Sequence, residues 1–232
     1  MQGEVTGLEQ AISEITVSRR DKGRLWLEFF LFFLVAPLIV AIALPPRMMF
    51  PALFTVTGIG LLLLFLTPGF RLRMLGAGVF RMSGTLVLVT TLGTLATGWV
   101  ILTMTRPEAL WLIVARNPEL MAMIALGYPL ASALPQEVVF RVLFFERYAA
   151  ILPRKLTPQI GLNALVFAWA HIMYWSWIVL ALTFVGGLLF AYSYRVRGNF
   201  PEAVVLHSVA GVMLFLVGMG IYFYSGNVQR PF

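Results

Sequence analysis

The sequence contains no cysteine, and only 12% of its 232 residues are charged. Without cysteine the chain can form no disulfide bond, thiolate zinc site or iron–sulfur cluster, and it has no cysteine nucleophile. Soluble domains usually have about 25% charged residues, whereas 60% of this chain is hydrophobic and its mean hydropathy is +0.89. These values exclude an ordinary soluble domain and predict an integral membrane protein.

Long apolar runs between short polar breaks predict the membrane spans. A helix needs about 20 apolar residues to cross a hydrocarbon core roughly 30 Å thick. The ten-residue alternation typical of a transmembrane barrel is absent. We therefore predict an all-α, polytopic transmembrane helical bundle of about seven spans, with an eighth element if residues 70–81 form an interfacial helix. The predicted spans are about 25–44, 49–67, 84–104, 119–147, 158–175, 177–194 and 201–224.

The basic residues predict the orientation. With the N-terminus in the cytoplasm, twelve of them lie on the cytoplasmic side and four on the other, which follows the positive-inside rule. The net charge of +7 therefore indicates topology, and we expect no nucleic-acid partner. The first 24 residues are polar and lack the apolar core of a signal peptide, so we expect the first span to remain as an anchor. The twelve are Arg19, Arg20, Lys22, Arg24, Arg71, Arg73, Arg81, Arg147, Arg154, Lys155, Arg195 and Arg197, and the four are Arg47, Arg106, Arg116 and Arg230.

Four ionisable residues lie deep within the predicted spans: Glu137, Arg141, His171 and His207. Such a side chain costs about 2.5 to 3.5 kcal/mol on insertion scales, so it usually faces the bundle interior and often marks function. Glu137 and Arg141 are four positions apart and can pair on one helix face, although a purely structural ion pair is the competing interpretation. Glu28 is a fifth candidate, but it lies near the cytoplasmic end of its span and we expect it to reach the headgroups.

The depths of these residues predict a shared cavity. At a rise of about 1.5 Å per residue, Glu137, His171 and His207 differ in depth by about 11 Å, a spread that helix tilt can reduce. A carboxylate can deprotonate a water molecule, a histidine can position it, and a further donor can stabilise the oxyanion. Such a set predicts peptide hydrolysis. A zinc site is possible by ligand type, but without an HExxH pair or local ligand spacing we expect no metal and no other cofactor.

Three short motifs follow one another on separate predicted helices. Residues 136–141 read QEVVFR, residues 167–171 read FAWAH, and residues 207–211 read HSVAG. They resemble the EExxxR, FxxxH and HxxxN or HxxxD motifs of the CPBP (CAAX prenyl protease and bacteriocin-processing, Abi) family of glutamic-type intramembrane proteases. The resemblance covers about residues 119–224. It implies an intramembrane endopeptidase that cleaves near the C-terminal end of a lipidated or membrane-anchored protein or peptide.

Two positions depart from these motifs. Gln136 holds the place of the glutamate that the resemblance identifies as the water-activating base, and an amide accepts no proton at neutral pH. Gly211 replaces the final Asn or Asp and removes an oxyanion donor, for which the backbone, Asn163 or Ser208 could compensate. Three explanations remain: Glu137 takes over as base, the chain is a non-catalytic bacteriocin-immunity or peptide-binding member, or an engineered Glu-to-Gln change has inactivated a protease. Because adjacent helix residues are about 100° apart, the first would need a differently placed water.

The resemblance also assigns roles to the site residues. We expect Glu137 to act as a water-activating or supporting acid and His171 as its partner. We expect His207 to be a transition-state donor and Arg141 to organise the site. A proton-coupled transporter is less well supported, because the chain has no repeated halves. The expected catalytic positions are Gln136, Glu137, Arg141, His171 and His207, with Asn163, Phe167 and Gly211 in support.

We expect one compact membrane domain. Residues 1–118 should hold the N-terminal cytoplasmic segment and three less specific spans, and residues 119–232 the core that carries the motifs. The expected partners are the lipid bilayer and a membrane-embedded or lipidated substrate. The expected location is a prokaryotic inner membrane, with the N-terminus in the cytoplasm.

Overall fold

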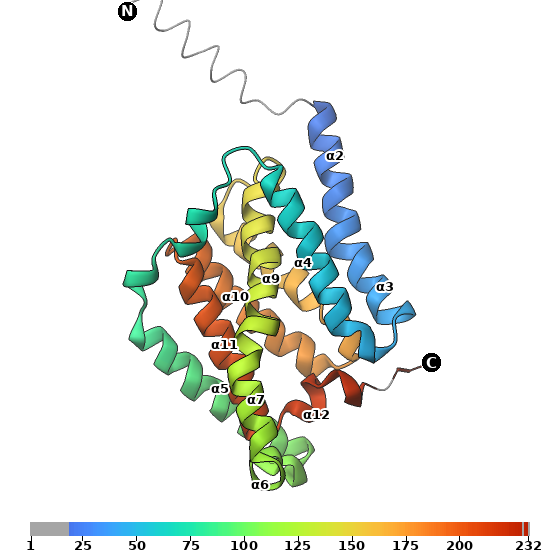
Figure 1. Ribbon diagram of the computed structural model, residues 1–232, viewed down its shortest axis with the longest axis vertical. Coiled ribbons are helices and arrows are strands. Elements are labelled where there is room, and N and C mark those ends of the chain that lie inside the picture. The colour runs from blue at the N-terminus through green and yellow to red at the C-terminus, as the bar shows by residue number, and fades with distance from the viewer. Residues whose placement is uncertain (1–18, 229, 232) are drawn as a thin grey trace, which may run out of the picture.

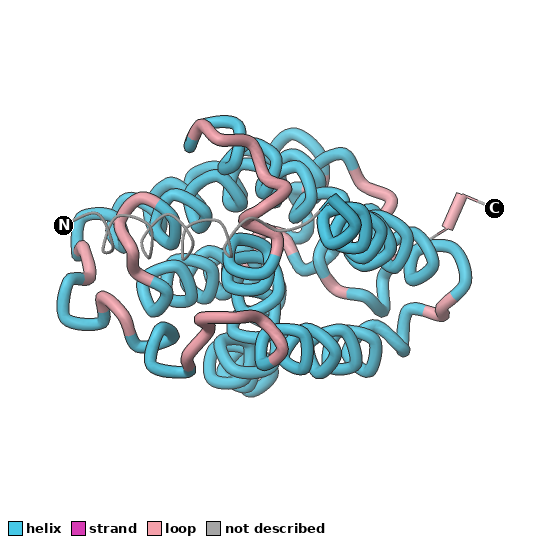
Figure 2. Tube along the Cα trace, turned by 90° about the horizontal axis from the view of Figure 1, so that it is seen from above, coloured by secondary structure: helices cyan, strands magenta, loops and turns pink. Residues whose placement is uncertain are grey.

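A computed structural model describes residues 19–228, 230 and 231. Most of the polar segment on which the signal-peptide argument depends, residues 1–18, lies outside the described residues. The described part is all-helical and contains no strand (Figure 2), which confirms the predicted helical bundle. Six of its helices are long and apolar enough to cross a membrane: Asp21–Ala43, Pro46–Phe65, Gly84–Thr105, Pro118–Arg147, Trp177–Arg195 and Phe200–Val217.

Several of these spans are composite helices (Figure 1). The first span contains three consecutive helical elements, and the fourth contains four, two of which are π-helical. The elements before the fourth span are α2 (Arg19–Phe30), η1 (Leu31–Val35), α3 (Ala36–Ala43), η2 (Pro46–Met48), α4 (Met49–Phe65), η3 (Leu72–Gly76), η4 (Val79–Arg81), α5 (Gly84–Thr105), η5 (Pro107–Ala109) and α6 (Leu112–Arg116). The rest are α7 (Pro118–Tyr128), η6 (Pro129–Ala133), α8 (Leu134–Glu137), η7 (Val138–Arg147), α9 (Leu156–Trp169), η8 (Ile172–Tyr174), α10 (Trp177–Arg195), α11 (Phe200–Val217), α12 (Gly220–Phe223) and η9 (Ser225–Asn227).

Side-chain caps fix where three of the later helices begin. The Asn117 side chain accepts a hydrogen bond from the Leu120 amide at 3.0 Å, and Pro118 follows it. Asn199 caps α11 in the same way, with Pro201 in the first turn. An asparagine cap followed by proline satisfies an end amide and presets the helical φ. Both helices begin one residue before the predicted spans 119–147 and 201–224, and Ser176 caps α10 similarly.

The fifth predicted span is shorter than expected. It contains α9, whose 14 residues extend about 21 Å, followed by the short turn η8. Trp175 adopts a left-handed backbone with φ 51°, and Ser176 then starts α10, so the chain reverses instead of continuing. His171 consequently lies at the turn between α9 and α10 and not within a helix.

Residues 70–81 do not form the single helix that the conditional eighth element requires. Two short 3₁₀ turns, η3 and η4, replace it, and Gly78 with φ 87° separates them. A Cβ atom at Gly78 would lie 2.7 Å from Cγ of Asn199, so this close approach requires glycine. Asn199 also donates a hydrogen bond to the Gly78 carbonyl at 2.8 Å, which fixes this connection to the start of α11.

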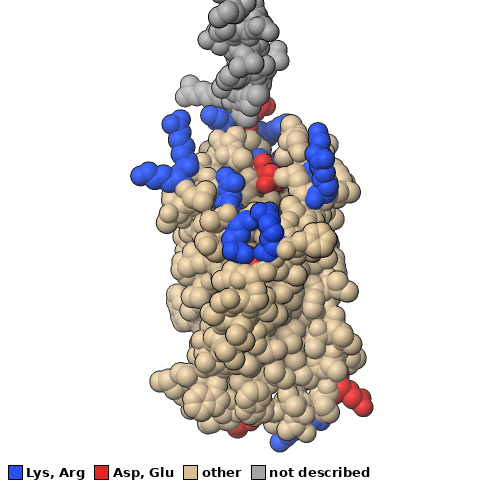
Figure 3. Space-filling view, turned by 90° about the vertical axis from the view of Figure 1, so that its left-hand side faces the viewer, with Lys and Arg blue, Asp and Glu red and all other residues tan. Residues whose placement is uncertain are grey.

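The motif-bearing helices form the centre of the bundle (Figure 1). Helix α10 packs between α9 and α11, α11 also packs on α5, and α4 packs on η7. Eight consecutive residues of η7, from Val138 to Phe145, are buried. Figure 3 shows Lys and Arg side chains gathered at the end of the molecule where α2 begins, as the positive-inside pattern predicts.

Candidate active site

A buried cluster joins the first and third motifs. The Glu137 and Arg141 side chains are completely buried, and Arg141 Nε donates to Glu137 Oε2 at 3.0 Å. His207 Nδ1 lies 2.9 Å from the other carboxylate oxygen, Oε1. Because an ionised carboxylate only accepts hydrogen bonds, Nδ1 of His207 carries the proton in this contact. The negative charge of Glu137 balances the positive charge of Arg141, so a neutral His207 leaves the cluster without net charge. The Nε2 atom of this neutral ring is then an acceptor.

Arg141 is held from several sides. Its Nη1 donates to the Asn163 side-chain oxygen, and Asn163 in turn donates to the Phe140 carbonyl. The guanidinium carbon lies 4.8 Å from the ring centroid of Phe167 and 5.7 Å from that of Phe190, a cation–π arrangement. The contacts of Asn163 are thus directed to Arg141 and the backbone, and its expected compensating role at the oxyanion has no support in this geometry.

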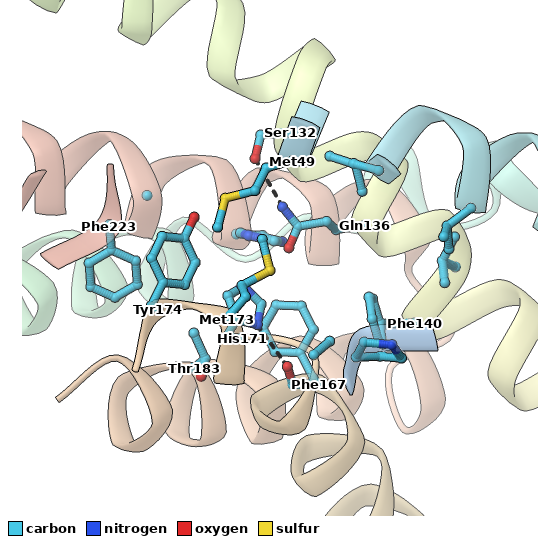
Figure 4. Close-up of a pocket in the computed structure, with 18 of the residues that line it drawn as sticks. Met49, Ser132, Gln136, Phe140, Phe167, His171, Met173, Tyr174, Thr183 and Phe223 are labelled. Atoms are coloured by element: carbon cyan, nitrogen blue, oxygen red, sulfur yellow. Dashed lines mark hydrogen bonds between the residues drawn. The ribbon is translucent and has the colours of Figure 1, made fainter. Parts of the chain in front are cut away.

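A cavity of about 240 Å³ lies beside this cluster. Gln136, His171 and His207 line it, whereas Glu137 and Arg141 do not. Figure 4 shows Gln136 and His171 pointing into it, Gln136 from α8 and His171 from the turn after α9. The remaining wall is mostly apolar and contains no Asp, Glu, Lys or Arg among the described residues; it includes Phe32, Phe33, Val40, Met49, Phe50, Leu53, Val56, Phe140, Phe167 and Met173.

The neighbours Gln136 and Glu137 therefore face different surroundings. Gln136 Nε2 donates to Ser132 Oγ at 2.9 Å at the cavity wall, while both oxygens of Glu137 are engaged behind it. The position of the family's base opens to the cavity, and the expected substitute Glu137 is directed away from it. The position of Glu137 consequently suits the supporting role and not the direct deprotonation of water in the cavity.

The second histidine is anchored to the backbone. His171 Nδ1 lies 2.7 Å from the Phe167 carbonyl, which can only accept, so Nδ1 carries the proton and Nε2 is an acceptor in the neutral ring. The ring stacks on Tyr174 with centroids 6.1 Å apart and an interplanar angle of 16°. Both histidines thus have a fixed tautomer and contribute to one cavity wall.

Tyr128 is the site residue that sequence reasoning missed. Its hydroxyl lies 3.2 Å from His207 Nε2, and it lines the cavity. The available signal was the spacing of Tyr128, Ser132 and Gln136, which follow at four-residue steps before and into the first motif. Ser208, by contrast, donates to the Val204 carbonyl at 2.7 Å and does not line the cavity.

Glu28 does not act as expected. Instead of extending toward headgroups, its carboxylate accepts hydrogen bonds from Arg147 and, at 2.8 Å, from the Tyr148 hydroxyl. Burial, and then the hydrogen bond to Glu28, raise the pKa of Tyr148, so the hydroxyl remains a donor. Glu28 therefore links the first span to the end of η7, away from the cavity.

Among the described residues, no group of three or more His, Asp or Glu side chains is placed to hold a metal ion. Glu137, His171 and His207 thus do not form the zinc set that their types allow. The expectation that no cofactor is needed stays a prediction.

A comparison with protein-family models matches residues 118–213 to a family described as type II CAAX prenyl endopeptidase Rce1-like. The matched region begins with α7 and ends within α11, so it contains all three motifs. The match confirms the resemblance to CPBP proteases that the motifs indicated. Searches of curated proteins and of solved structures found no match.

Proposed function

We propose, from the match of residues 118–213 to the type II CAAX prenyl endopeptidase Rce1-like family, that the chain is an intramembrane endopeptidase. Its substrate is a lipidated or membrane-anchored protein or peptide, cleaved near the C-terminal end. The observation that carries this proposal is the cavity in which Gln136, His171 and His207 meet, with Glu137 held directly behind His207.

His207 is the proposed proton acceptor. Its Nδ1–H is fixed on Glu137, so Nε2 carries the lone pair at the cavity. A carboxylate that orients an imidazole and stabilises the imidazolium is the arrangement that activates serine in serine hydrolases. Here the same pair acts on water, because Gln136 is an amide and cannot take the proton itself.

The reaction then proceeds in two steps. Water oxygen attacks the carbonyl carbon of the scissile peptide while His207 Nε2 takes one water proton, and the carbonyl π electrons move to oxygen. The tetrahedral intermediate collapses, the C–N bond breaks, and His207 returns the proton to the leaving nitrogen. Gln136 and His171 orient the water, and Arg141 keeps the Glu137 carboxylate ionised and in place.

The cavity wall supports an apolar substrate segment. No described lining residue is an Asp, Glu, Lys or Arg, and α3 and α4 contribute aromatic, proline and methionine side chains. Such a surface suits a lipid chain or hydrophobic residues, with the few polar groups fixing the reacting bond. The proposed orientation has the N-terminus and the basic end of Figure 3 in the cytoplasm, in a prokaryotic inner membrane.

A second candidate function is binding without catalysis. Gln136 and Gly211 stand at two positions where the family's motifs have catalytic side chains. A bacteriocin-immunity or peptide-binding member would use the same cavity and need neither side chain. An engineered Glu-to-Gln change predicts instead that activity returns with glutamate.

The test is proteolysis of farnesylated and membrane-anchored C-terminal peptides by the reconstituted protein, with products identified by mass spectrometry. We expect the present sequence to cleave, His207→Ala to abolish cleavage, and Gln136→Glu to raise the rate about tenfold or more by adding a carboxylate base. Glu28→Gln, outside the cavity, is the control. Cleavage by Gln136→Glu alone would contradict the role of His207 as the base and indicate an inactivated protease. No cleavage by either folded form would favour the binding function.

A further inference from the structure

Tyr128 and Gly211 occupy one space in the cavity wall. A Cβ atom built on Gly211 would lie 2.2 Å from Cε1 and Cζ of Tyr128 and 2.5 Å from its hydroxyl oxygen. Real Cβ atoms essentially never approach other atoms so closely. Any side chain at position 211 would therefore displace the Tyr128 ring. A side chain at position 211 and the Tyr128 ring cannot both occupy this space in the present arrangement.

We propose that Tyr128 supplies the oxyanion donor that Gly211 lacks. The inference rests on the proposed endopeptidase function and assigns to it a further catalytic residue. Tyr128 comes from the end of α7, whereas the missing donor belongs on α11. The hydroxyl thus reaches the same place from a different helix.

The ring of Tyr128 is held in position. It meets the rings of His207 and Phe215 edge-on, with centroids 6.0 and 6.1 Å apart. Pro129 follows directly and starts the π-helical segment η6, which leads to Ser132 and Gln136 on the same wall. A donor held by its surroundings loses little freedom when the reaction begins, which favours stabilisation of developing charge.

The other expected donors are engaged elsewhere. Asn163 contacts Arg141 and the Phe140 carbonyl, Ser208 donates to Val204, and neither lines the cavity. Gln136 donates to Ser132. Of these four side chains, Tyr128 alone combines a hydroxyl with a place at the cavity and a contact to His207.

Tyr128 has two hydrogen-bonding states in the reaction. In the free protein its O–H donates to His207 Nε2, since this nitrogen is the acceptor in the neutral ring. When water and the peptide enter, rotation of the hydroxyl about its C–O bond directs the hydrogen to the substrate carbonyl oxygen. Nε2 is then released to accept the water proton. Tyr128 keeps its proton throughout, so the proton and electron balance of hydrolysis is unchanged.

The first test replaces Tyr128 with Phe, which keeps the ring over Gly211 and removes only the hydroxyl. Loss of one oxyanion donor typically lowers kcat by about 10² to 10³, and we expect such a loss with KM changed less than about threefold. Tyr194→Phe is the matched control, because its partly buried hydroxyl donates to Glu146 and it does not line the cavity. A kcat within about twofold of the unmodified chain would overturn the proposal.

The second test exchanges the two side chains. Tyr128→Ala should lose activity. The double variant Tyr128→Ala with Gly211→Asn should be about tenfold or more as active as Tyr128→Ala, because asparagine then has room and restores a donor. Gly211→Asn alone should destabilise the protein through the Tyr128 contact. Failure of the double variant to exceed folded Tyr128→Ala would contradict the exchange.

Binding separates this proposal from the endopeptidase function. The probe is a farnesylated peptide with a phosphinate, a tetrahedral oxyanion mimic, in place of the amide after the modified cysteine. Its matched control carries a methylene-amine that has no oxygen at that position. Tyr128→Phe should weaken phosphinate binding about tenfold or more and leave the methylene-amine peptide unchanged, even if the chain cleaves no peptide. Equal effects on both probes, or no phosphinate binding by the unmodified chain, would overturn the donor role.

Discussion

Two Glu–Arg pairs involve the same long helix, and their surroundings differ. Glu137 and Arg141 pair within the helix with both side chains fully buried, and the third partner is His207 at the cavity. Glu28 and Arg147 connect two helices, with 22% and 9% of their side chains exposed, and the third partner is Tyr148. Residue type is the same in both pairs. What lies beyond the carboxylate distinguishes them: an imidazole that opens to a cavity in one, and a phenol in the packed bundle in the other.

The comparison shows how an intramembrane charge can be identified as functional or structural. Burial alone favours neither, since both carboxylates are compensated by arginine and one further donor. In the deep pair, Glu137–Arg141, the carboxylate contacts His207, whose Nε2 can accept a proton at the cavity wall. The outer pair ties the first span to η7, and Arg147 also donates to the Leu63 carbonyl of α4 at 2.9 Å.

The largest expected difference between the pairs is in activity. Glu137→Gln preserves shape but presents an amide to His207 Nδ1 and removes the charge that stabilises the imidazolium. The equivalent change in a serine protease triad lowers kcat about 10⁴-fold, and we expect a loss of about 10³-fold or more. Glu28→Gln should stay within about twofold. Comparable losses of kcat in the two variants would remove the functional distinction.

The loss of stability should also be larger for the Glu137–Arg141 pair than for the Glu28–Arg147 pair, but the two losses should differ less than the losses of activity. Glu137→Ala leaves Arg141 buried without its counter-charge, a change that typically costs about 3 to 5 kcal/mol. Glu28→Ala leaves Arg147 with the Leu63 carbonyl and the Thr67 hydroxyl as acceptors, which limits the loss to about 1 to 3 kcal/mol. Reversible unfolding in mixed detergent, followed by circular dichroism, measures both. A larger loss for Glu28→Ala would show that the outer pair carries more of the fold.

The smallest expected effect concerns the substrate terminus. Neither arginine of the two pairs lines the cavity, and the described wall has no other cation. A free C-terminal carboxylate of the substrate therefore finds no charged partner there. Converting it to an amide in a cleaved peptide should change kcat/KM by less than about twofold. A loss of tenfold or more would indicate a cation at the site that the described side chains do not supply.

The sequence predicted the bundle and the starts of the spans 119–147 and 201–224 to within one residue, because these depend on local signals. Apolar length, and the caps at Asn117 and Asn199, are properties of neighbouring residues. It also separated Gln136 from Glu137, because adjacent helix positions diverge by about 100°. The structure places the first at the cavity and the second behind it.

The errors involve tertiary contacts. The reversal of the chain after α9 includes a left-handed backbone at Trp175, a conformation that bulky residues rarely adopt. Glu28 was expected at the headgroups, since its place along the span does not reveal that Arg147 lies opposite it. Tyr128 was missed because its role depends on contact with Gly211, a residue from another helix.

The central claim is that Glu137 orients His207 so that Nε2 is an unprotonated acceptor at the cavity. Because the chain has only two histidines, ¹⁵N-histidine labelling gives a spectrum of two rings, which His171→Gln assigns. At neutral pH in detergent micelles we predict that His207 carries its proton on Nδ1 and none on Nε2. In Glu137→Gln this preference should weaken. A His207 protonated on Nε2 in the unmodified chain, either alone or together with Nδ1, would contradict the account.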